Sequence, residues 1–65
     1  MSGPELRQLR KDAGVTQVEL AEFLGYKVNG EPNRSMIARM ECGYVAINFR
    51  IELLINHFFE KKNDN

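Results

Sequence analysis

The residues from Val15 to Leu20 constrain the fold of this chain more than any other segment, because they mark the start of a helix. Thr16 stands three residues before Glu19, the spacing of a capping box, in which each side chain accepts a hydrogen bond from a backbone amide that the helix leaves free. Val15 is placed to pack on Leu20 as a hydrophobic staple. These signals predict a helix over residues 17–24, ended by Gly25, because glycine tolerates the left-handed backbone conformation that stops a helix.

A second capping box, formed by Ser2 and Glu5, predicts another helix from the start of the chain to about residue 13. Gly14 supplies its left-handed stop, and only two or three residues then separate the first helix from the second. The expected core positions of the first helix are Leu6, Leu9 and Ala13. The sequence therefore begins with a tight pair of helices.

The next segment, from Tyr26 to Glu31, contains the turn dipeptide Asn29-Gly30, and the sequence predicts a loop here. A third helix is expected over about residues 33–41, with Ile37 and Met40 facing inward and a glycine at residue 43 ending it.

Asn48 is placed to cap a final helix that runs to about residue 61. Its expected apolar face consists of Ile51, Leu54, Ile55 and Phe58. A turn at residues 44–47 would add a fifth helix. The predicted fold class is all-α with four to five short helices and an extended loop, in one domain over residues 1–65, of which 62–65 form a frayed tail.

Composition limits the possible roles of a chain of 65 residues, which is long enough for one small domain only. Nine Lys and Arg balance nine Asp and Glu, so the net charge does not by itself indicate a nucleic-acid partner. One cysteine, Cys42, excludes an intrachain disulfide framework and fits a reducing compartment. No apolar run approaches the length of about 18 residues that spans a bilayer, and no leader is evident, so a cytoplasmic protein without a membrane role is expected.

Three groups of residues together match the pattern of a known family. They are Leu9-Arg10, then Thr16-Gln17 with Leu20-Ala21 and Gly25, then Ile37 with Met40-Glu41 and Gly43. With these residues, the segment from residue 6 to about 59 resembles the lambda-repressor/Cro (Xre-type) helix-turn-helix family. The resemblance implies an ion pair between Arg10 and Glu41. The chain departs from the family between Gly25 and Ile37, where it holds about six residues more than the usual turn.

The resemblance implies that the third helix enters the major groove of double-stranded DNA, where an arginine can make a bidentate contact to guanine. The outward residues of this helix are the candidates for base contact: Asn33, Arg34, Ser35, Ala38 and Arg39. The candidates for contact with the DNA backbone lie at helix starts and in the loop: Thr16, Gln17, Tyr26, Lys27, Asn48 and Arg50.

Apolar residues on the outer side of the last helix suggest a second interface. Phe49 and Leu53 lie one turn apart and opposite the predicted core face, and Phe59 is a further candidate. They are either scattered surface residues, which need no explanation, or the interface of a C2 homodimer. We expect the dimer.

The expected function is a dimeric transcriptional repressor on an inverted-repeat operator, with half-sites about 34 Å apart, that autoregulates its own operon. Such a chain resembles the small regulators of phages and mobile elements, which include Cro-like, antitoxin-like and anti-CRISPR-associated repressors. No effector domain is evident. The alternative is an antitoxin-like interaction module that binds a partner protein through the last helix or the loop, and the zero net charge favours it slightly.

Catalytic and metal-binding roles are not expected. His57 has no second ligand at metal-binding spacing, and Cys42 has no histidine base near it in the sequence. The chain also lacks a glycine-rich phosphate loop and a nucleophile elbow. We therefore predict no enzyme activity, no metal and no cofactor.

Overall fold

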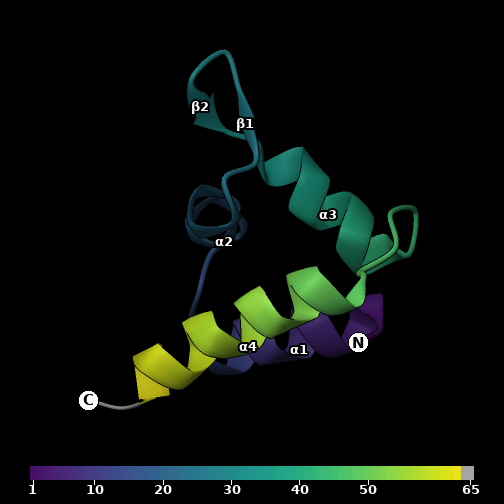
Figure 1. The fold of residues 1–65 in the computed structure, drawn as a ribbon, viewed down its shortest axis with the longest axis vertical. Helices are drawn as coiled ribbons and strands as arrows, with labels where there is room; N and C mark the ends of the chain where they lie inside the picture. Colours follow the sequence, from purple (N-terminus) through teal and green to yellow (C-terminus); the bar gives the residue numbers. More distant parts are fainter. Residues whose placement is uncertain (64–65) are drawn as a thin grey trace.

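The structure, a computed structural model, describes residues 1–63 and contains four helices and one short β-hairpin (Figure 1). The helices are α1 (Gly3–Asp12), α2 (Gln17–Leu24), α3 (Arg34–Cys42) and α4 (Phe49–Asn63), and the strands are β1 (Lys27–Val28) and β2 (Glu31–Pro32). Both α1 and α2 pack on α3, and α2 also contacts α4. The all-α fold class with four helices is confirmed, whereas residues 44–47 form no fifth helix.

The helix starts follow the capping signals of the sequence. The Thr16 hydroxyl accepts a hydrogen bond from the Glu19 amide at 3.0 Å, and the Glu19 carboxylate accepts one from the Thr16 amide at 3.4 Å. Ser2 and Glu5 form the same reciprocal pair. The Asn48 side chain accepts from the Ile51 amide at 2.9 Å. All three caps were predicted, because a helix start is determined by residues that are close in sequence.

The hydrophobic core lies where the four helices meet. It consists of Leu6, Val15, Leu20, Ala21, Ile37, Met40, Ile55 and Phe59. The inward positions of Ile37 and Met40 are confirmed. Other predictions were wrong: Leu9 and Leu54 are 37% and 41% exposed, whereas Phe59 is only 5% exposed. On α4 the buried side chains, Ile55 and Phe59, lie one turn apart, so the helix is rotated from the predicted face toward Phe59.

The predicted loop after α2 is a two-stranded antiparallel hairpin. Lys27 pairs with Pro32, and Val28 pairs with Glu31. The connecting residues Asn29 and Gly30 have positive φ values of 53° and 83°, as a two-residue type I′ turn requires. The turn was predicted from this dipeptide, but strands of two residues are too short to show an alternating pattern.

A close approach of α1 to α3 depends on Gly3, which is buried. A Cβ atom at this position would lie 2.4 Å from the backbone oxygen of Glu41 and 2.5 Å from that of Met40. The absence of a side chain therefore allows the first turn of α1 to rest on the last turn of α3.

The end of the chain differs in part from the prediction of a frayed tail over residues 62–65. Helix α4 continues to Asn63, so residues 62 and 63 are helical, and residues 64–65 lie outside the described part. Within residues 1–63, none of the helices combines the length and apolar character needed to cross a membrane.

Candidate nucleic-acid interface

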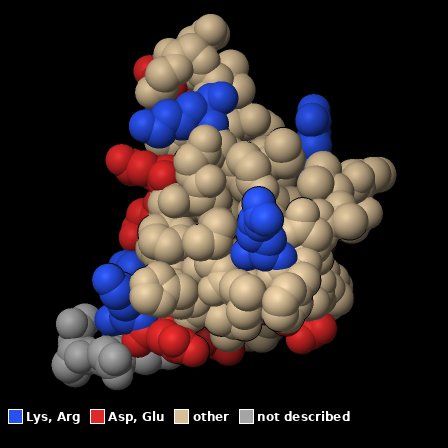
Figure 2. All heavy atoms as spheres, in the orientation of Figure 1, with Lys and Arg blue, Asp and Glu red and all other residues tan. Residues whose placement is uncertain are grey.

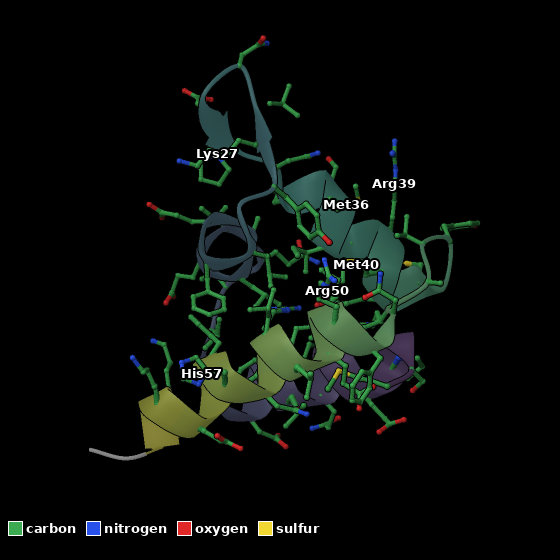
Figure 3. The ribbon with its side chains drawn as sticks, viewed as in Figure 1. Lys27, Met36, Arg39, Met40, Arg50 and His57 are labelled. Atoms are coloured by element: carbon green, nitrogen blue, oxygen red, sulfur yellow. The ribbon has the colours of Figure 1, made fainter. Side chains whose placement is uncertain are left out.

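Helix α3 presents a polar face to solvent. Its inward face is fixed by Ile37 and Met40, which are 0% and 1% exposed. Arg34, Ser35 and Arg39 are exposed, and Figure 3 shows Arg39 pointing away from α4. The other two candidates for base contact are both half-buried: Asn33 at the start of the helix and Ala38 in its middle.

The exposed charges of α3 are both positive, because its one acidic residue is buried. Glu41 is 8% exposed and pairs with Arg10 of α1: Nε of Arg10 lies 2.7 Å from Oε2, and Nη2 lies 3.3 Å from Oε1. Arg10 also donates to the backbone oxygen of Val15 at 3.1 Å. The ion pair expected from the resemblance is present, and it leaves the positive charges of Arg34 and Arg39 uncompensated on their own helix.

The other acidic side chains of the described residues lie on different elements, which explains how a neutral chain has a positive helix face. They are Glu5, Asp12, Glu19, Glu22, Glu31, Glu52 and Glu60. In the view of Figure 2, acidic groups lie along the lower edge and the left side of the molecule, while basic groups lie at the upper left, the upper right, the centre and the lower left. The net charge of zero therefore averages over regions of opposite sign.

The side chain of Gln17, a predicted phosphate contact, has a hydrogen-bond partner within the protein. Its side-chain amide donates to Oε1 of Glu41 at 3.2 Å, so this donor is directed inward between α2 and α3. Thr16, the preceding residue, is exposed at the start of α2. The phosphate contact of Gln17 stays a prediction, and its side-chain amide is held by the buried Glu41 carboxylate, which has acceptor capacity that Arg10 does not fill alone.

The remaining candidates for backbone contact fall into two classes. Lys27 on β1 and Arg50 on α4 are exposed, and Figure 3 shows them, with Arg39, on different sides of an area around Met36. Tyr26 is half-buried and packs against the core, so only part of its side chain is accessible as a surface contact. Asn48 is exposed, but its side-chain oxygen caps α4.

One exposed aromatic residue beside α3 was not predicted as a functional residue. Tyr44, which follows the helix-ending Gly43, is 84% exposed. Its backbone amide donates to the carbonyl oxygen of Arg39 at 2.9 Å, which fixes the start of the α3–α4 connection to the last turn of α3. The only sequence signal was its position, an aromatic residue directly after a glycine that stops a helix.

The predicted dimer surface is exposed in part. Phe49 and Leu53, one turn apart on α4, are 75% and 53% exposed. Phe59 is buried in the core and forms an edge-to-face contact with Phe58, with ring centroids 5.2 Å apart. The inclusion of Phe59 in this surface was therefore wrong.

The pKa shifts of two glutamates arise from helix caps and lie away from α3. A hydrogen bond from Lys62, followed by the backbone amide of Thr16, holds the pKa of Glu19 below its ordinary value. The pKa of Glu5 is lowered by its hydrogen bonds with Ser2. These carboxylates serve as structural anchors of α1 and α2.

No cavity and no group of three or more metal-ligating side chains occurs within residues 1–63. His57 and Cys42 are both exposed. The candidate site is thus a convex helix face, formed by α3 and the residues around it. No protein-family model matches the chain, and neither a curated protein nor a solved structure is significantly similar to it.

Proposed function

We propose that this chain binds double-stranded DNA in a sequence-specific manner and contacts the bases of the major groove with α3. The observation that carries the proposal is the distribution of charge on this helix: Arg34 and Arg39 are exposed, whereas Glu41 is buried and paired with Arg10. The major groove accepts an α-helix, and each arginine can bind O6 and N7 of guanine. The pattern shared with lambda-repressor/Cro-like proteins supports the same reading.

Contacts with the phosphates would position α3 on the duplex. Lys27 and Arg50 are exposed cations on elements next to α3, and the hydroxyl of Tyr44 is a further donor. Such contacts set register and affinity but carry no sequence information. Arg34, Ser35 and Arg39 would therefore determine which sequence is bound.

A homodimer would double this interface. Phe49 and Leu53 form an exposed apolar pair on α4, and a second copy of the chain would remove it from water. The proposed protein is a cytoplasmic repressor that occludes a promoter, including that of its own operon, through an inverted-repeat operator.

The proposal is tested by selection from a library of duplexes with a randomised core of about 30 base pairs, three helical turns. The purified protein is expected to enrich one inverted repeat, and Arg39→Ala is expected to lose that enrichment. Arg7→Ala, which removes the same charge from an exposed position of α1, serves as the control. Absence of any enriched sequence with the wild-type protein would contradict the proposal.

An interaction module that binds another protein is the second candidate. The exposure of Phe49, Leu53 and Val28 favours it, because apolar side chains at these positions suit a protein partner. The two candidates differ in the effect of Arg39→Ala, which would weaken sequence-specific DNA binding but leave a partner bound through α4 or the hairpin.

A further inference from the structure

We propose that the β1–β2 hairpin is a second DNA-binding element, which contacts the sugar-phosphate backbone beside the groove segment that α3 occupies. This inference rests on the proposed function of α3. It assigns a role to residues 27–32, which lengthen the connection between α2 and α3.

The hairpin is placed at the end of α3 that would lead into the groove. Only Asn33 separates β2 from α3, and Figure 3 shows the hairpin projecting to the same side of the molecule as Arg39, away from α4. A helix of nine residues is about 13 Å long, similar to the groove width of about 12 Å. A projection beyond its N-terminus therefore meets the backbone at the groove edge.

The base of the hairpin is firmly attached to the core. The Tyr26 amide donates to the carbonyl oxygen of Ala21 at 3.0 Å, and the Asn33 amide donates to that of Tyr26 at 2.7 Å. Tyr26 also packs against the core, and β2 contacts α2. The tip is consequently held in a defined position relative to α3, which reduces the entropy lost when it binds.

The tip itself contributes little to the fold. Every residue from Lys27 to Glu31 is exposed, and Val28 is 52% exposed. Within the described residues, no hydrogen bond or ion pair is formed by the side chains of Lys27, Asn29 or Glu31. A two-stranded hairpin is marginally stable by itself, so a well-formed tip whose residues are exposed is suited to a role in binding.

The chemistry of the tip fits a phosphate backbone. The amide groups of Asn29 and Gly30 lie outside the strand pairing and can donate to phosphate oxygens, as can the Asn29 side chain. Lys27 adds a positive charge, although Figure 3 shows its side chain directed away from α3. Glu31 is the one unfavourable charge, so its removal should strengthen binding.

Two changes that alter charge but preserve the backbone test this inference on the duplex enriched by the wild-type protein. Asn29→Asp keeps a residue type that tolerates positive φ, and it is expected to weaken binding about fivefold through one added charge near a phosphate. Glu31→Gln is expected to strengthen binding by a similar factor. The matched controls are Asn56→Asp on α4 and Glu22→Gln on α2, both exposed, which should change affinity less than twofold.

Hydroxyl-radical footprinting supplies the second readout. The wild-type protein is expected to protect backbone positions flanking each α3 site, and Asn29→Asp should lose this flanking protection while the central protection remains. Equal effects of the tip variants and their controls, with an unchanged footprint, would refute the role of the hairpin alone. Failure of the wild-type protein to bind any duplex would instead refute both this inference and the proposed function. If the protein then binds a protein partner and the tip variants weaken that binding, the hairpin would be a protein-binding element.

Discussion

The side-chain amide of Gln17 donates a hydrogen bond to Oε1 of Glu41 at 3.2 Å, which joins the first turn of α2 to the last turn of α3. Because Arg10 of α1 binds the same carboxylate, three helices meet at one buried acidic group. The pair of charges adds little net stability when it is compared with an apolar alternative, but breaking it leaves a buried charge unpaired. Glu41 therefore fixes the angle of α3 relative to the helices that support it.

Replacing Gln17 with alanine separates a structural role from a phosphate contact. We expect Gln17→Ala to lower the free energy of unfolding by about 1 kcal/mol, because one hydrogen bond to Glu41 is lost. The salt dependence of DNA binding should stay unchanged, because the amide does not face the duplex. Urea denaturation and binding titrations at several salt concentrations measure the two effects. A smaller salt slope with unchanged stability would show that Gln17 contacts a phosphate.

A methyl group at position 3 should disturb the contact between α1 and α3. Gly3→Ala places a Cβ atom against the backbone oxygens of Met40 and Glu41, which cannot move as a flexible side chain would. We expect a loss of about 2–3 kcal/mol in stability, measured by urea denaturation. Arg7→Ala, at an exposed position of the same helix, should change stability by less than about 0.5 kcal/mol. Similar stabilities of the two variants would rule out the close approach.

Acid should weaken the fold partly through Glu19. Its pKa is lowered in the folded chain, first by Lys62 and then by the Thr16 amide, so the stabilisation is complete above the ordinary glutamate pKa of about 4.3. It is lost as the pH falls through the lower folded value. We expect the Tm of Glu19→Gln to fall less steeply than that of the wild-type protein below about pH 4. Glu22→Gln, at an exposed position of the same helix, should keep the wild-type slope, and equal slopes for both variants would contradict the assignment.

The dimer can be tested apart from the groove contacts. Leu53→Asp places a charge in the proposed apolar interface, so it should shift the protein from dimer to monomer in sedimentation velocity. Binding to a full inverted repeat should weaken, whereas binding to one half-site should stay the same. Asn56→Asp adds the same charge on α4 without removing an apolar side chain, and should remain dimeric. A complex in which only one wild-type chain sediments with the full operator would refute the dimer.

Local sequence signals predicted more of this fold than long-range ones. The caps at Ser2, Thr16 and Asn48, and the turn at Asn29-Gly30, depend on neighbouring residues and were predicted correctly. The rotation of α4 was not, because Leu54 and Phe59 flank the same stripe and only tertiary packing decides which is buried.

The candidate site shows the same division. The exposure of Arg34 and Arg39 follows from the helix periodicity that buries Ile37 and Met40. The inward turn of Gln17 depends on a carboxylate 24 residues away in the chain, which no local pattern indicates. The role of α3 in DNA binding is a proposal that rests on the exposure of Arg34 and Arg39 and on the buried pair of Glu41 with Arg10.

The most direct test of that proposal compares the affinity of Arg39→Ala with that of Arg7→Ala by fluorescence anisotropy, on the selected duplex and on a scrambled duplex of equal length. We predict that Arg39→Ala weakens binding to the selected duplex by about 5- to 150-fold for each half-site, the value of one bidentate base contact, and binding to the scrambled duplex much less. Arg7→Ala should change both by less than twofold. Equal behaviour of the two variants on both duplexes would contradict the claim that α3 reads the DNA sequence.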